Sequence, residues 1–278
     1  MTDHNDTSGT DQEDCQEPRL PPSAAMLPVL TSLTEALTRW KTGDRLIPTA
    51  YDFDDVPVHE FGEHLARMPL ALEGWTMGEV VPIGAGVSGE RDILQRLSGD
   101  MNLMSSKDLA DRFTDALEGS RLAAAFKRIQ EAETLAELLR DDSTLGWSGF
   151  SGKRVDPEKE AEITRQRMFA DRYRGVFDWT MLRGWDAALG AALIVEAEKA
   201  EMIDRASAAR FLSRAAGEMM VRFASWHEFA RSLLFARVFQ ALAASESYAK
   251  DVLAADEALL AALLEGPWAQ FSWPRIRK

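Results

Sequence analysis

Apolar side chains recur every three or four residues through most of the chain, which is the repeat of an amphipathic α-helix. The run through Met26, Leu30 and Leu37 shows this repeat, and Gly43 ends it. The one strand-like stretch, Glu79–Ile83, contains a proline, which argues against a central strand. We therefore predict an all-α fold, an irregular multi-helix globular bundle with little or no strand. The repeat predicts helices over residues 23–43, 58–68, 105–119, 121–140, 157–200, 206–221, 225–239 and 248–264.

Four places in the chain have residue types that begin a helix. Ser105, Asp204 and Ser225 each stand at an N-cap position, where a side-chain oxygen accepts a backbone N–H. Asp156 precedes a proline, which is favoured at the first helical position. These signals fix where four of the predicted helices begin. The long 157–200 segment has two candidate breaks, Gly175 and Gly184.

The N-terminal segment differs in composition from the rest of the chain. Residues 1–17 contain six acids, no Lys or Arg, and almost no apolar side chains. Such a segment cannot bury enough surface to offset its ordering entropy. We predict a disordered acidic tail over residues 1–22 and a helical domain over residues 23–278. A Gly- and Ser-rich connector divides that domain into an N-terminal helical part, 23–150, and a C-terminal one, 155–278.

The charge of the chain limits its partners. Its formal net charge is -13, and the six acids of the tail leave -7 for the remaining residues. Negative charge repels nucleic acid and anionic membranes at long range. We expect no nucleic-acid or membrane partner, and a protein partner of basic charge.

Targeting and redox signals are sparse. The longest uninterrupted apolar stretch, residues 187–195, is far shorter than the ~20 residues that cross a bilayer. The acidic N-terminus has no basic region followed by an apolar one, so we expect a cytoplasmic protein. A single cysteine, Cys15, cannot form an intramolecular disulfide.

Three patterns resemble chemical sites. The Gly84–Gly89 segment has the G-x-G-x-x-G spacing of a dinucleotide loop, but no βαβ pattern surrounds it. His59 and His64 are five apart, and metal ligands on one helical face are about four apart. Asp178 and Asp186 are eight apart, which separates them by about 12 Å along a helix. We predict no cofactor, no metal and no catalytic residue from these patterns.

The tryptophans indicate packing. Trp185 and Trp226 lie in helical segments with apolar neighbours, where large aromatic side chains are usually core. The C-terminal residues have two interpretations: they dock on their own domain, or they bind a partner. We expect a partner-binding role for the aromatic-basic segment of Trp268, Phe271, Trp273 and Arg275.

Residues 184–240 resemble a known family in their order of motifs. The motifs are Trp185-Asp186, then Met202-Ile203-Asp204, then the Ser-Trp helix start at Ser225-Trp226, and Ala236-Arg237. Upstream, Gly119-Ser120-Arg121 is similar to a Gly-His-Arg helix end. The chain thus resembles the bacterial domain of unknown function 1266 family, which includes YbeU/YbeR-like proteins. The resemblance covers about half of the chain and implies a helical fold without a known reaction.

The chain departs from the family pattern at three positions. Leu189 stands where the family has arginine, Ser120 where it has histidine, and Ala236 where it has glycine. If these polar residues form a shared site, this chain has lost part of it. The departures therefore favour a scaffold over an enzyme.

Asp186 and Arg237 have apolar neighbours in their predicted helices. Buried charges are rare unless they are paired. We therefore predict an ion pair between Asp186 and Arg237 that fixes the register of two helices.

The function predicted from the sequence is non-catalytic binding of another protein. One specific version is an immunity or accessory protein that neutralises a basic secreted toxin by charge complementarity. The alternative is an enzyme or small-molecule binder with a pocket between the C-terminal helices. The candidate pocket residues are Trp185, Asp186, Glu196, Trp226, His227 and Arg237.

Overall fold

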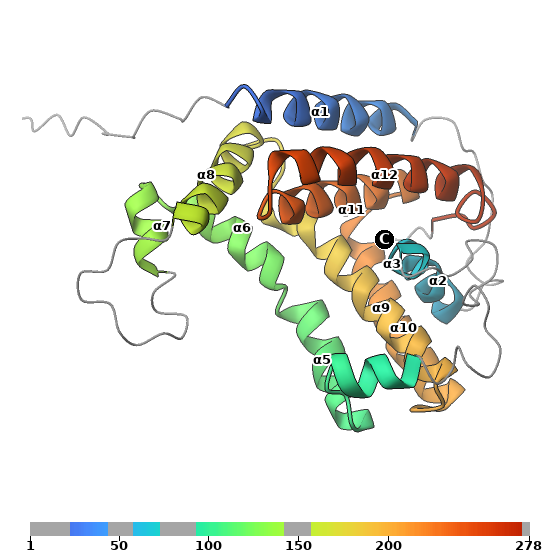
Figure 1. The fold of residues 1–278 in the computed structure, drawn as a ribbon. Helices are drawn as coiled ribbons and strands as arrows, with labels where there is room; N and C mark the ends of the chain where they lie inside the picture. Colours follow the sequence, from blue (N-terminus) through green and yellow to red (C-terminus); the bar gives the residue numbers. More distant parts are fainter. Residues whose placement is uncertain (1–22, 44–57, 73–92, 142–156, 274–278) are drawn as a thin grey trace, which may run out of the picture.

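The computed structural model describes residues 23–43, 58–72, 93–141 and 157–273 (Figure 1). The predicted tail, the candidate strand, the Gly84–Gly89 segment, most of the connector and Arg275 lie outside the described residues. Within these ranges the chain is helical and contains no strand, so the predicted all-α fold is confirmed. No helix there is long and apolar enough to cross a membrane. The elements are α1 (Met26–Gly43), α2 (Val58–Leu65), α3 (Arg67–Leu72), the π-helix η1 (Arg96–Asp100), α5 (Ser106–Glu118), α6 (Arg121–Glu131), α7 (Leu135–Asp141), α8 (Pro157–Arg172), the 3₁₀-helix η3 (Trp179–Leu182), α9 (Arg183–Lys199), α10 (Arg205–Arg222), α11 (Trp226–Ala241) and α12 (Glu246–Glu265).

The predicted helix starts are confirmed wherever the structure describes them. Ser105 Oγ accepts from Asp108 N at 3.2 Å, and Asp204 Oδ1 accepts from Ser207 N at 2.7 Å. Ser225 Oγ accepts from the backbone N–H of Glu228 at 3.1 Å. The N-cap signals are local, and tertiary contacts did not override them.

Two predicted helices are divided in the structure. In the 157–200 segment the first helix, α8, ends at Arg172. Gly175 follows with a φ of 77°, a conformation that favours glycine. Gly184 is no break, because it lies in the first turn of α9 and its missing side chain makes room for Ser232 of α11. The 121–140 segment is interrupted at Ala132, whose backbone is extended.

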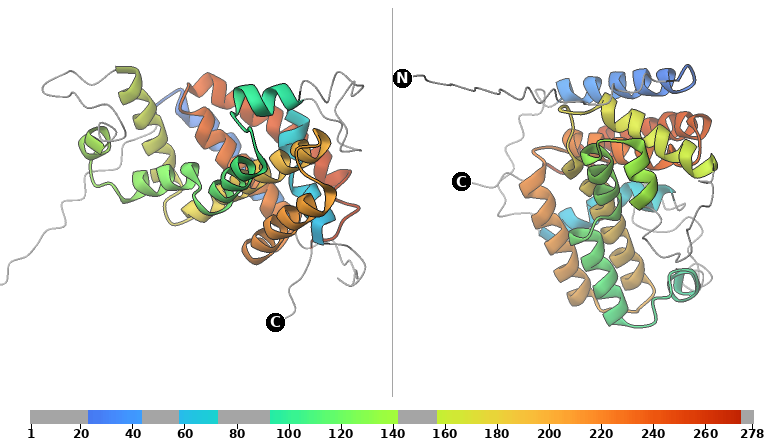
Figure 2. Two further views of the ribbon diagram at one scale, coloured as in Figure 1. Left: turned by 90° about the horizontal axis from the view of Figure 1, so that it is seen from below. Right: turned by 90° about the vertical axis from the view of Figure 1, so that its left-hand side faces the viewer.

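Helix α9 is the centre of the fold. It packs against α2, α3, α5, α10 and α11, and twelve of its seventeen residues are buried. A helix that is apolar on all sides belongs in the interior. Figure 2 shows α1, α11 and α12 together at one end of the molecule, with α5, α9 and α10 extending toward the other. The side chains that line the site described below come from α9 and the helices around it.

The residues after α12 return to the body of the protein. The Trp268 ring stacks on Trp226 with centroids 4.8 Å apart, and its Nε1 donates to the His64 carbonyl at 2.9 Å. Trp226 Nε1 donates to the Phe271 carbonyl at 2.6 Å. The Trp273 ring packs edge-on against Trp226. Trp268 is 1% exposed, so the expectation that it contacts a partner is corrected: this side chain belongs to the core because an indole ring gains most from burial.

Candidate functional site

A hollow of about 540 Å³ opens beside α9, between α3, η1, α5, the start of α6, and α11. Its volume lies in the range of roughly 300–1,000 Å³ that is typical of small-molecule sites. Its wall has a polar part and an apolar part. The polar side chains are Arg96, Arg112, Asp115, Ser120, Arg121, Asp186, Glu196 and Arg237.

Asp186 and Ser120 form one polar pair of the hollow. Asp186 lies in the first turn of α9, and its Oδ2 accepts a hydrogen bond from Ser120 Oγ. The same hydroxyl accepts from Ala123 N at 3.0 Å, so Ser120 both caps α6 and donates to Asp186. Burial raises the pKa of Asp186 to about 6, and the bond from Ser120 and the charge of Arg183 only partly oppose that rise. Asp186 can therefore change its protonation near neutral pH.

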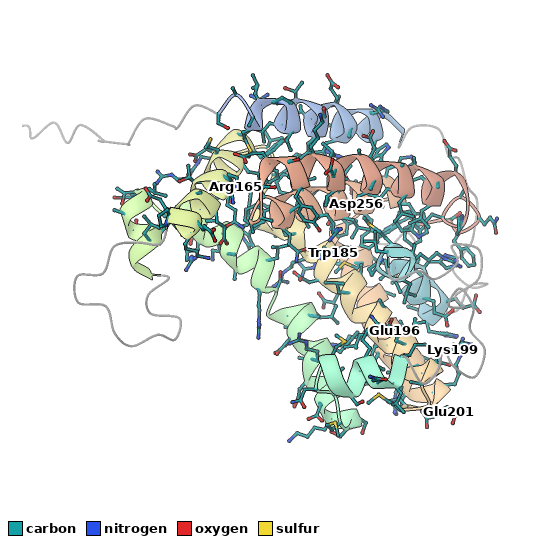
Figure 3. All side chains as sticks on the ribbon, viewed as in Figure 1. Arg165, Trp185, Glu196, Lys199, Glu201 and Asp256 are labelled. Atoms are coloured by element: carbon teal, nitrogen blue, oxygen red, sulfur yellow. The ribbon has the colours of Figure 1, made fainter. Side chains whose placement is uncertain are left out.

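Arg237 and Trp185 form a second part of the wall. The Arg237 guanidinium carbon lies 5.0 Å from the centroid of the Trp185 ring, within the range of a cation–π contact. Arg237 Nε donates to Asp256 Oδ2 of α12 at 2.9 Å. Burial raises the pKa of Asp256, and Arg237 opposes that rise. Figure 3 shows Trp185 on α9 and Asp256 on α12.

The predicted ion pair between Asp186 and Arg237 is wrong. Both side chains line the hollow, but Arg237 pairs with Asp256 and Asp186 bonds to Ser120. Asp256 is 1% exposed, so its carboxylate needs a cation more than that of the less buried Asp186.

Arg96 and Glu196 form an ion pair that joins η1 to α9. Glu196 is buried on α9 (Figure 3), and a buried carboxylate requires such a partner. The pair holds one turn of π-helix against the hollow. Single π-helical turns are frequent at functional sites.

The structure brings together only some of the residues that the sequence predicted for a pocket. Trp185, Asp186, Glu196 and Arg237 line the hollow. Trp226 belongs instead to the aromatic cluster around Trp268, and His227 in the first turn of α11 does not line the hollow.

Sequence reasoning missed three of the four arginines of the hollow. Arg96 and Arg112 lie outside every motif, and Arg121 belongs to the family pattern only as part of a helix end. Their spacing in the sequence does not match a helical repeat, so the sequence gives no sign that these arginines lie together.

Asp178 is not on the same helix as Asp186. It accepts from Thr180 N at 2.8 Å as the cap of η3, so the two residues do not form a carboxylate pair on one helix.

Replacing Asp186 with asparagine is expected to stabilise the protein above pH 6. The folded pKa of about 6 lies above the value of 3.8 for a free carboxyl, so the folded state holds more protons between these values. The free energy of unfolding therefore falls as pH rises through that window, by about 1–2 kcal/mol after allowance for partial exposure. The free energy of unfolding of Asp186→Asn should exceed that of the unaltered protein by that amount at pH 7.5 and should equal it at pH 3.5, as measured by urea unfolding.

The matched control, Asp115→Asn, replaces an exposed acid of the same hollow, and its stability should change little at either pH. A less stable Asp186→Asn at pH 7.5 would contradict the assignment.

Comparison with known proteins gives a family but no activity. The family model described as "Protein of unknown function (DUF1266)" matches residues 88–273, more than half of the chain. No curated protein and no solved structure matches. The matched range contains α5, α6, α9 and α11, which supply most of the hollow. The chain therefore belongs to the DUF1266 family.

Proposed function

We propose that the protein binds a small organic molecule in the hollow beside α9. The observation that carries this proposal is that residues far apart in the sequence, from Pro69 to Arg237, line one concave site. Concave sites with an apolar wall and a few convergent polar groups are the usual form of ligand sites. A partly buried carboxyl group with a raised pKa is a further mark of such sites. The small-molecule alternative drawn from the sequence is thereby favoured over the protein-binding one.

The residues that carry the family resemblance support the same site. Trp185, Asp186, Arg121 and Arg237 match the pattern and line the hollow. Ser120 and Leu189, two of the three departures from the pattern, line it as well. With serine and leucine in place of histidine and arginine, the hollow is less basic here than the family pattern implies. The residues at positions 120 and 189 therefore affect which ligand fits the hollow.

Proton transfer is the form of catalysis that this hollow supports. A carboxyl group with a pKa of about 6 gives and takes a proton efficiently near neutral pH. Asp186 is the group we assign to that role if the bound molecule is also transformed.

Filling the hollow tests the proposal. Leu189 lines the hollow and is 41% exposed, so Leu189→Trp should occupy the site without disturbing the core. We expect saturation-transfer NMR on a mixture of small carboxylates, phosphate esters, amines and alcohols to detect binding to the unaltered protein. Leu189→Trp should abolish that signal.

A matched substitution controls for added surface aromaticity. Val221 on α10 is 75% exposed and does not line the hollow, so Val221→Trp should leave binding unchanged. Binding that survives Leu189→Trp, or no binding in any class of compound, would refute the proposal. A protein partner, the function favoured by the sequence, would then be the remaining prediction.

A further inference from the structure

The arginines of the hollow differ in how their charge is balanced. Arg96 is paired with Glu196, and Arg237 is paired with Asp256. For Arg112 and Arg121 the described part of the chain provides no ion-pair partner. Asp115, the third acid of the hollow, forms no ion pair with either of them within the described ranges. Two guanidinium groups are therefore available to a ligand.

Arg112 and Arg121 come from two consecutive helices. Arg112 lies on α5, Arg121 is the first residue of α6, and Ser120 between them is fixed by its cap bond to Ala123. Both arginines are exposed and both line the hollow. Guanidinium groups bind carboxylates and phosphates through paired charge-assisted hydrogen bonds. The two helices thus contribute two donors of this kind to the hollow.

Another part of the wall is apolar and partly open to solvent. Leu72 of α3 is 42% exposed and Leu189 of α9 is 41% exposed, and both line the hollow. Leu70, Leu193 and Met101 extend this apolar wall. Exposed leucines beside a concave surface lose contact with water when an apolar group covers them. The hollow therefore offers apolar contact as well as positive charge.

We infer that the ligand is an organic anion, with an oxyanion bound by Arg112 and Arg121 and an apolar body against Leu72 and Leu189. The inference deepens the proposed function and rests on it. Carboxylates and phosphate monoesters share the chemistry that two guanidinium groups recognise. The apolar wall requires more than the headgroup, so inorganic anions alone should bind weakly.

Calorimetric titration with matched probes tests the inference. Octanoate and octyl phosphate carry the two possible headgroups on one apolar body, octanol lacks the charge, and acetate and inorganic phosphate lack the body. We expect octanoate, octyl phosphate or both to bind at least about tenfold more tightly than octanol, the effect of one charge-assisted hydrogen bond. The tighter of the two identifies the headgroup.

Substitution of the arginines gives the second arm. The double variant Arg112→Gln, Arg121→Gln should weaken binding of the tighter anion about tenfold or more while leaving octanol unchanged. Arg172→Gln, which alters an exposed arginine of α8 away from the hollow, should leave every probe unchanged.

The outcomes separate this inference from the proposed function. Equal binding of octanol and the anions, or a double variant that binds octanoate and octyl phosphate as before, overturns the anion inference. If Leu189→Trp then still abolishes binding, the hollow remains a small-molecule site. If Leu189→Trp has no effect on any bound probe, the proposed function fails as well.

Discussion

Replacing Gly62 with alanine is expected to destabilise the protein by about 3 kcal/mol, the upper part of the range for overpacked interiors. Gly62 lies in α2 where this helix crosses α10. A Cβ atom there would overlap the Leu212 carbonyl oxygen and lie 2.7 Å from the carbonyl carbon. Backbone atoms inside a helix cannot turn away as a side chain can, so the two helices must separate. Urea unfolding monitored by circular dichroism measures the loss.

Gly217 provides the matched control, because the same substitution should have the opposite sign there. It lies within α10, and a Cβ atom at this position would meet nothing within 4 Å. Alanine is a better helix former than glycine by roughly 0.5–1 kcal/mol, so Gly217→Ala should stabilise by that amount. Similar stabilities for the two variants would show that α2 does not approach α10 as closely as described.

Acid is expected to destabilise the protein through His64, by about 4 kcal/mol between pH 6.5 and pH 3. His64 is 3% exposed, and its Nδ1 accepts from Arg67 Nε at 2.8 Å. The centroids of the His64 and Phe271 rings are 3.6 Å apart. Burial, and then the charge of Arg67, lowers the pKa of His64 to about 3. The unfolded chain takes up the proton near 6.5, so the unfolded state binds more protons throughout this window. The stabilisation is complete above pH 6.5 and is lost as pH falls toward 3.

Comparing pH profiles isolates this effect. Asp186 acts in the opposite direction between pH 3.8 and 6, so the comparison belongs in the Asp186→Asn background. There, His64→Gln should flatten the decline of the unfolding free energy between pH 6.5 and 4, whatever its effect at pH 7. The Asp186→Asn protein with His64 intact is the reference. A His64→Gln profile parallel to that reference would exclude His64 as the source of acid sensitivity.

Much of the helical architecture follows from local sequence. The caps at Ser105, Asp204 and Ser225 depend on a side chain and a backbone N–H only three residues apart, so sequence alone identifies them. The apolar repeat likewise identifies the buried faces, because a helix places residues three and four apart on one side. The start of α12 is not among the predicted caps, although the Ser245 hydroxyl accepts from Tyr248 N in the same way. The apolar repeat alone predicts this start two residues after the helix begins.

The apolar neighbours of Asp186 and Arg237 in their helices already indicate that both side chains need polar partners. Which partners they find depends on the fold: Arg237 meets Asp256, and Asp186 meets Ser120, which lies 66 residues earlier in the chain. The fold also brings four arginines and a tryptophan around one hollow. Helical periodicity states which side of a helix is buried, whereas the neighbour on that side depends on how whole helices cross, and that is set by close approaches such as Gly62 against Leu212.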